Sequence, residues 1–272
     1  MQKVPLIIRC SSLHKLMGNP TGGTNLVKYE KAVLKLEEER EKYAKIKNKE
    51  TDTANKKNKL IIDLGKELIE LNRNKNVVIL SQTCKTWIKD SAKEYFYGYK
   101  SEITGKMLDK GHINEDTAIL RLNYKLGTNF SKNEVRKENG WLTGECDIDH
   151  KEAKTIRDIK NAWSMETFPA FEEDVNKKVK EAGYDYQQKG YLILWKYERA
   201  FIDYCFTPTP EDLLSSYDNM SIHTINEDLD AGKYITTSEE ITLEEGEEKE
   251  IKNKHKYAEL YFNECLAELN AK

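Results

Sequence analysis

The spacing of apolar residues changes along the chain, and this change limits what the chain can fold into. Apolar side chains recur every three or four residues over 26–43 and again over 60–71, which predicts two amphipathic helices joined by the polar run 47–58. Residues 140–149 and 154–161 instead alternate between apolar and polar side chains, as half-buried strands do. The sequence therefore predicts a fold that contains both helices and strands.

The segments between and after these elements carry similar signals. Aromatic residues in 85–110 follow a helical pattern, and a second helix is expected over 113–121. Residues 77–80 fit either a short strand or the lead-in to the next helix. Helical spacing returns over 185–198, and 200–206 has the composition of a short apolar strand. This order predicts a mixed α/β core with flanking helices.

Composition excludes several classes of protein. Charged residues make up 33% of the 272 residues, and no stretch approaches the roughly 18 apolar residues that a membrane-spanning helix needs. The first residues lack the basic region and apolar block of a secretory signal. The five cysteines are scattered and form no CxxC pair, which favours a reducing compartment. We therefore expect a cytoplasmic protein with no membrane partner.

The net charge of -3 is unevenly distributed. Residues 226–250 contain ten acids and two lysines, a net charge of -8, so the remainder carries +5. Residues 1–76 contain 17 basic and 10 acidic residues, a net charge of +7. A basic N-terminal region is compatible with a polyanionic partner, although a solvated lysine-rich surface explains the same charges.

Two acids and a lysine lie in the predicted strands. A period of two places Asp158 and Lys160 on one face of the strand 154–161. Eleven residues upstream, Asp147 lies near the end of the other strand-like segment. Two adjacent strands would bring Asp147 and Asp158 within reach of one metal ion, with Lys160 beside them. Acid-x-lysine triplets are common in a chain this rich in charged residues. The assignment of Asp158 and Lys160 therefore depends on their position in a predicted strand next to Asp147.

Carboxylates that hold a divalent cation next to an ammonium suit phosphodiester hydrolysis. The cation polarises the phosphoryl oxygen and lowers the pKa of bound water towards about 7, and the lysine orients or helps to deprotonate that water. Oxygen ligands favour Mg²⁺ or Mn²⁺ over Zn²⁺. On these two strands alone, a surface hairpin with salt bridges fits equally well.

Two further features extend the pattern. Glu115 lies just inside a predicted helix ahead of the strands, and Gln187-x-x-x-Tyr191 places two side chains on one face of the helix after them. Together with Gly144-Glu145-Cys146-Asp147 and Asp158-Ile159-Lys160, this ordered set resembles the PD-(D/E)xK nuclease superfamily. It is most similar to the phage exonucleases of the lambda exonuclease and YqaJ type. The phrases DIKNAWSMETFPAF and IRCSSLHKLM also resemble those proteins.

The resemblance implies a restriction-endonuclease-like α/β core, in which a central mixed sheet is flanked by helices and an inserted helical hairpin is added. It also implies a role for each site residue: metal ligands at Glu115, Asp147 and Asp158, a catalytic lysine at Lys160, and Gln187 and Tyr191 lining the site or contacting DNA. Where the family usually has proline before the second acid, this chain has Cys146. Glu145 and Asp149, on the same face as Asp147, therefore remain rival ligands.

The resemblance covers about residues 80–215 and the first dozen residues. We expect four regions: a nuclease core formed by 1–25 and 76–220, a helical hairpin or arm at 26–75, an acidic segment at 221–250 and a C-terminal helix at 251–272. For the hairpin, the favoured interpretation is packing on the core or on a neighbouring subunit. Its basic turn could instead touch the DNA backbone.

The implied function is that of a metal-dependent DNA nuclease, most simply an exonuclease that hydrolyses linear duplex DNA in phage-type recombination or DNA processing. Its cofactor would be one or two Mg²⁺ or Mn²⁺ ions, and its partners would be DNA and a single-strand annealing protein. A homo-oligomer is compatible with this reading, and a phage-encoded protein would work in the host cytoplasm. The alternatives are a catalytically inactive DNA-binding or assembly protein with a nuclease fold, and a structural protein whose hairpin forms a coiled coil.

The sequence argues against other chemistries. Its five histidines show no HxxxH or HxH spacing, so a zinc site is not expected. It has no GxxxxGK[ST] loop, so we do not expect an intrinsic ATPase. The missing cysteine cluster also argues against an iron–sulfur nuclease.

Overall fold

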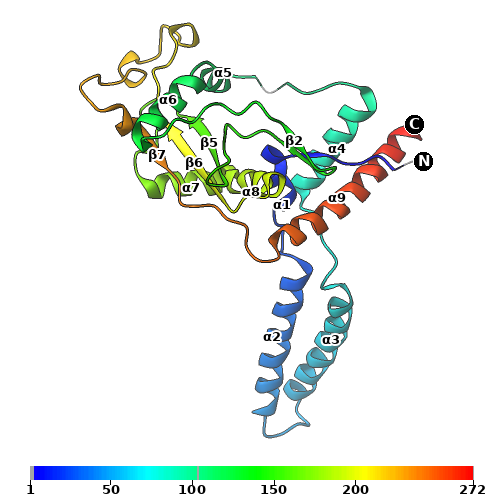
Figure 1. The fold of residues 1–272 in the computed structure, drawn as a ribbon. Helices are drawn as coiled ribbons and strands as arrows, with labels where there is room; N and C mark the ends of the chain where they lie inside the picture. The colour runs from blue at the N-terminus through cyan, green and yellow to red at the C-terminus, as the bar shows by residue number, and fades with distance from the viewer. Residues whose placement is uncertain (1–2, 103, 272) are drawn as a thin grey trace.

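The strands of the computed structural model form two sheets in the part of the chain that it describes, residues 3–102 and 104–271 (Figure 1). In the smaller sheet, β3 (Leu142–Gly144) pairs in parallel with β1 (Ile8–Arg9) and antiparallel with β2 (Lys137–Glu138). The larger sheet has the order β4-β5-β6-β7, with bounds Ile148–His150, Thr155–Asn161, Arg199–Cys205 and Ile235–Thr237. Its two central strands, β5 and β6, are parallel and the outer pairs are antiparallel. The predicted mixed α/β class is confirmed.

Helices cover both faces of the larger sheet (Figure 1). Buried residues of α6 (Glu115–Leu126) pack against apolar residues of β4, β5 and β7 on one face. On the other face, α7 (Glu172–Ala182) packs on β6, and α8 (Tyr184–Trp195) joins the largest core. That core also includes α1 (Leu13–Met17), α4 (Gln82–Tyr97) and α9 (Glu247–Asn270).

The segment 140–149, predicted as one strand, is two strands in two different sheets. The chain leaves the smaller sheet after Gly144 and enters the larger one at Ile148. The side chain of Asn133 donates to Cys146 O at 2.8 Å, and its backbone N–H donates to Asp147 O at 2.7 Å. These bonds satisfy the polar backbone between the strands, so the alternating pattern continues through a break in the pairing.

Other predicted elements differ mainly in their ends. The helix expected over 85–110 ends at Tyr97, because Gly98 adopts the left-handed conformation, and α5 (Lys106–Ile113) follows as a separate helix. Residues 77–80 are the lead-in to α4 and form no strand. The helix expected over 113–121 is α6. Lys272, in the C-terminal region expected to be helical, lies outside the described residues.

Two long helices, α2 (Asn25–Ala44) and α3 (Asp52–Asn74), form an antiparallel arm that projects from the body of the molecule (Figure 1). We use "arm" for residues 25–74. Thr24 and Thr51 cap the two helices by accepting hydrogen bonds from Val27 N and Ala54 N. The two helices extend away from the nuclease core, so the arm does not pack on it, and the other part of that expectation, packing on a neighbouring subunit, stays a prediction (Figure 1).

The structure also bears on membranes and disulfides. Among the described residues, no helix is both long and apolar enough to cross a membrane. All five cysteines are buried and free.

Candidate active site

The side chains of Asp158 and Lys160 share one face of β5, as the strand pattern predicted. Asp158 is 1% exposed, and the ammonium of Lys160 lies 2.5 Å from its Oδ2. Apart from this ion pair, no described residue donates a hydrogen bond to this buried oxygen. Burial alone would lower the pKa of Lys160, but Asp158 and Asp147 outweigh it and raise that pKa above its ordinary value. The ring of Tyr184 lies 4.8 Å from the ammonium.

Asp147 lies beside this pair at the start of the larger sheet. Its Oδ2 accepts a 2.6 Å hydrogen bond from the backbone N–H of Ile159, the residue between Asp158 and Lys160. Burial and the nearby charge of Asp158 raise the pKa of Asp147 to about 8. The two acids are therefore neighbours, as expected, although no continuous hairpin joins their strands.

Glu115 is the first residue of α6, on the opposite side of the sheet from α8. Its charge acts on Asp147 and raises the pKa of that acid further. Its own Oε2, however, lies 2.8 Å from the ammonium of Lys132. No three histidine, cysteine, aspartate or glutamate side chains among the described residues are close enough to share a metal ion. The role of Glu115 as a ligand stays a prediction.

Gln187 and Tyr191 extend from α8 toward the same acid. Gln187 Nε2 donates to Tyr191 OH at 2.9 Å and lies 3.5 Å from Asp158 Oδ1. Tyr191 can pack this closely because Gly144 has no side chain: a Cβ there would lie 2.7 Å from the tyrosine ring. Burial raises the pKa of Tyr191 above its ordinary range, so its hydroxyl stays protonated.

The rival ligands have other partners. Glu145 Oε2 lies 3.1 Å from a guanidinium nitrogen of Arg136. Asp149 accepts hydrogen bonds from Trp195 Nε1 at 2.9 Å and Tyr197 OH at 3.0 Å. Both carboxylates are thus engaged away from Asp158, whereas Asp147 is beside it.

Residues that no sequence pattern marked also hold this region together. Asn133 fixes the backbone at Cys146 and Asp147, and Lys110 is fully buried where β5 ends. The ammonium of Lys110 donates to Ala162 O at 2.7 Å, Trp163 O at 3.0 Å and Thr209 Oγ1 at 2.9 Å. No sequence spacing marks these contacts, because they join segments 13 to 99 residues apart.

The residues of this site fit a divalent cation. Two acids lie together with only one nearby ammonium, and among the described residues that ammonium is the partner of the buried Asp158 Oδ2. Carboxylate oxygens are the ligands that Mg²⁺ and Mn²⁺ prefer. Asp147 and Asp158 would hold such an ion, and Glu115 could join them by leaving Lys132.

Comparison with known proteins finds a structural likeness that covers nearly the whole chain. No family model matches the sequence, and no curated protein matches it. The chain is similar to a phage-related exonuclease from Haemophilus somnus 129PT, with a TM-score of 0.74 and 28% identity, over 98% of this chain and 97% of that chain. A weaker likeness is to an alkaline exonuclease from Laribacter hongkongensis, with a TM-score of 0.47 and 10% identity, over 72% of this chain and 87% of that chain. The phage-exonuclease resemblance that the motifs indicated is therefore confirmed for the fold, over nearly the whole chain.

Proposed function

We propose that this protein is a metal-dependent deoxyribonuclease that acts as an exonuclease on linear duplex DNA. One observation carries the proposal: two adjacent acids, the half-buried Asp147 and the buried Asp158, lie beside Lys160 in a chain whose fold matches a phage-related exonuclease along almost its full length. This combination suits hydrolysis of a phosphodiester far better than it suits a structural ion pair, because one ammonium does not balance two adjacent carboxylates.

Each side chain has a separate task in this proposal. Asp147 and Asp158 hold the cation, and Asp147 is assigned in preference to Glu145 and Asp149, which have other partners. Lys160 places its ammonium where the attacking water and the phosphate oxygens would lie, so that it orients one and stabilises the charge that develops on the other. Gln187 keeps Asp158 in position through its amide and its bond to Tyr191.

A divalent cation, Mg²⁺ or Mn²⁺, would supply a polarised phosphoryl oxygen and a water of lowered pKa. Glu115 is the third ligand in the proposal. Its present partner, Lys132, is itself a cation at the edge of the site, so exchange of Lys132 for the metal would leave the charge of Glu115 compensated.

The biological setting is proposed from the same likeness. An exonuclease of phage type would process duplex ends during recombination, together with a single-strand annealing protein and in the host cytoplasm. The number of ions, one or two, and any homo-oligomer belong to the proposal as well.

Digestion of matched DNA substrates tests the proposal. Linear and covalently closed circular duplex of the same sequence would be incubated with the protein, with Mg²⁺ or with a chelator. We expect loss of the linear duplex only, and only with Mg²⁺. Equal cleavage of the circle would make the protein an endonuclease. Binding of DNA without any cleavage would favour the inactive nuclease-fold alternative.

A further inference from the structure

The arm contributes little to the packing of the molecule. Only Leu36, Ala54 and Leu64 are buried among its described residues. At its base, Asn25 Nδ2 donates to Asn74 O and Val77 O, both at 3.0 Å. Because α2 has 20 residues, the far end of the arm lies about 30 Å from this base.

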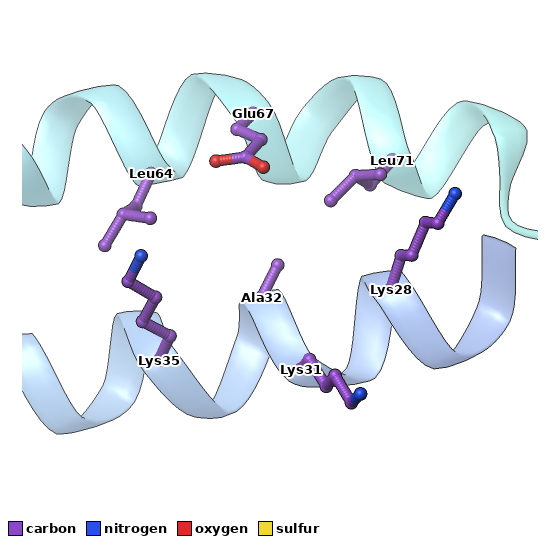
Figure 2. A pocket seen from close by; sticks show the side chains of 7 residues that line it. All are labelled: Lys28, Lys31, Ala32, Lys35, Leu64, Glu67 and Leu71. Carbon is purple, nitrogen blue, oxygen red and sulfur yellow. The ribbon is translucent and has the colours of Figure 1, made fainter. Parts of the chain in front are cut away.

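We call the arm outside residues 42–59 the shaft. A groove of about 280 Å³ runs between its two helices (Figure 2). On α3, Leu64, Glu67 and Leu71 line it; on α2, Lys35 lies beside Leu64, Ala32 lies across from Glu67, and Lys28 lies beside Leu71. Charges of both signs therefore mix along the shaft. Outside residues 42–59, the arm carries six basic and eight acidic residues, a net charge of -2.

The far end has a different character. Residues 42–59, which we call the tip, contain seven lysines and two acids, a net charge of +5. Lys42 and Lys57 pair with glutamates of α2, and Lys49 lies 4.0 Å from the ring of Tyr43. The four remaining lysines of the tip are exposed and form no ion pair with any described acid: Lys45, Lys47, Lys56 and Lys59.

This surface suits a phosphate backbone better than a protein. Protein interfaces are depleted in lysine and rely on buried aromatic or aliphatic side chains. The large apolar side chains exposed on the arm, such as Leu34, Ile62 and Ile69, lie along the shaft, and none lies in the tip. Lysines on a polar surface instead gain affinity for DNA by releasing its counterions.

We propose that the tip binds the phosphate backbone of duplex DNA outside the active site. The inference rests on the proposed function, which makes duplex DNA the substrate. The phage-related exonuclease matches 98% of this chain, so the arm lies within the part of the molecule that the two proteins share. The tip thus acts as a second, sequence-independent contact with the DNA.

The reach of the arm predicts a dependence on DNA length. About 30 Å corresponds to about nine base pairs of B-form duplex. A duplex of about eight base pairs is shorter than the arm, so it cannot contact the active site and the tip together, whereas one of about 30 base pairs is more than three times as long as the arm.

The test compares two triple variants. In one, the tip lysines Lys47, Lys56 and Lys59 become serine. In the matched control, three exposed lysines on α9 become serine: Lys249, Lys252 and Lys256. Both variants lose the same charge on exposed helix or loop surface, so a general effect of net charge is the same in each. DNA affinity is measured with a chelator, over a range of salt concentrations, on both duplex lengths.

We expect the tip variant to bind the long duplex more weakly and with a flatter salt dependence, by about 0.9 in the log–log slope for each lost contact. The short duplex and the control variant should behave like wild type. A tip variant with the wild-type slope on the long duplex overturns the inference, as does an equal change in the control. Digestion of linear DNA by the unmodified protein tests the proposed function separately, because digestion depends on Asp158 and Lys160 and not on the tip. If the unmodified protein digests DNA and the tip variant keeps the wild-type slope, only the inference about the tip fails.

Discussion

Gly144 lies where a methyl group has no room. A Cβ at this position would lie 2.7 Å from the ring of Tyr191 and 2.8 Å from Cys10 Sγ. We expect Gly144→Ala to lower the free energy of unfolding by about 1–3 kcal/mol, the cost of overpacking a filled core. Denaturant unfolding measures this. Gly111→Ala is the control, since nothing lies within 4 Å of a Cβ there and alanine favours the helix α5 by about 0.5–1 kcal/mol. Equal unfolding free energies of the two variants would contradict the close packing of Gly144 against Tyr191 and Cys10.

Lys110 should give stability a specific pH dependence. Burial lowers its pKa to about 8 in the folded protein, below the ordinary value of 10.5 that the unfolded chain keeps. Between these two values the unfolded chain binds more protons, so the lysine makes the unfolding free energy rise with pH. Lys110→Met lacks this contribution.

The wild-type advantage over Lys110→Met should therefore grow as the pH rises from about 8 to about 10.5, and stay constant below that range. Denaturant unfolding at several pH values measures the difference in unfolding free energy between wild type and Lys110→Met. The contributions of other titrating groups cancel in this difference. A difference that is flat across the window, or that shrinks, would show that the ammonium is not destabilised by its burial.

Single-residue patterns predicted the part of the site that follows from strand geometry. A period of two is enough to place Asp158 and Lys160 on one face of β5. The position of Asp147 was also expected. The contacts of Asn133 and the pairing of Glu115 with Lys132 depend on a loop between α6 and β2, and no periodic pattern encodes a loop path.

At the scale of elements, helices with clear apolar stripes were predictable and interruptions of pairing were not. The stripes over 26–43 and 60–71 form α2 and α3. The alternation over 140–149 continues across the change of sheet, because residues on both sides of the break are buried alternately. The helix α7 was not anticipated, since only Val175 and Val179 are buried in an otherwise polar segment.

The arm should be dispensable for the fold of the body. Replacing residues 26–73 with a short Gly/Ser linker removes few buried side chains, and Asn25 and Asn74 already lie within hydrogen-bond distance at its base. We expect the thermal transition of the body to move by less than about 4 °C, the shift for roughly 1 kcal/mol. Calorimetry checks this. A protein without a cooperative transition would mean that the arm is part of the core.

At the scale of the whole molecule, the first and last elements hold each other in place (Figure 1). Asn263 on α9 makes two hydrogen bonds with the backbone of Val4, and His255 Nε2 lies 2.6 Å from Leu6 O. Lys254 donates to Met17 O at 3.0 Å. These partners are more than 230 residues apart, so sequence patterns alone did not predict that α9 completes the main core.

Removal of α9 should therefore unfold the protein, in contrast to removal of the arm. Truncation after Gly246 exposes the core surface that Ile251, Ala258, Phe262 and Leu266 cover. Burying the three larger of these side chains contributes about 1.5–3 kcal/mol each, comparable in sum to the stability of a whole domain. We expect the truncated chain to lose its cooperative unfolding transition in circular dichroism. A truncated chain with native-like stability would contradict this role of α9.

The central claim is that Asp147, Asp158 and Lys160 form one cation-dependent hydrolytic centre. The most direct measurement follows Mn²⁺ binding by calorimetry and Mg²⁺-dependent digestion of linear duplex DNA in the same preparations of wild type, Asp158→Asn and Lys160→Ala. We predict that Asp158→Asn loses both metal binding and digestion, whereas Lys160→Ala still binds Mn²⁺ but digests DNA at least about a hundredfold more slowly, as expected for loss of a group that stabilises developing charge. Digestion by Lys160→Ala at close to the wild-type rate, or undiminished Mn²⁺ binding by Asp158→Asn, would contradict the account.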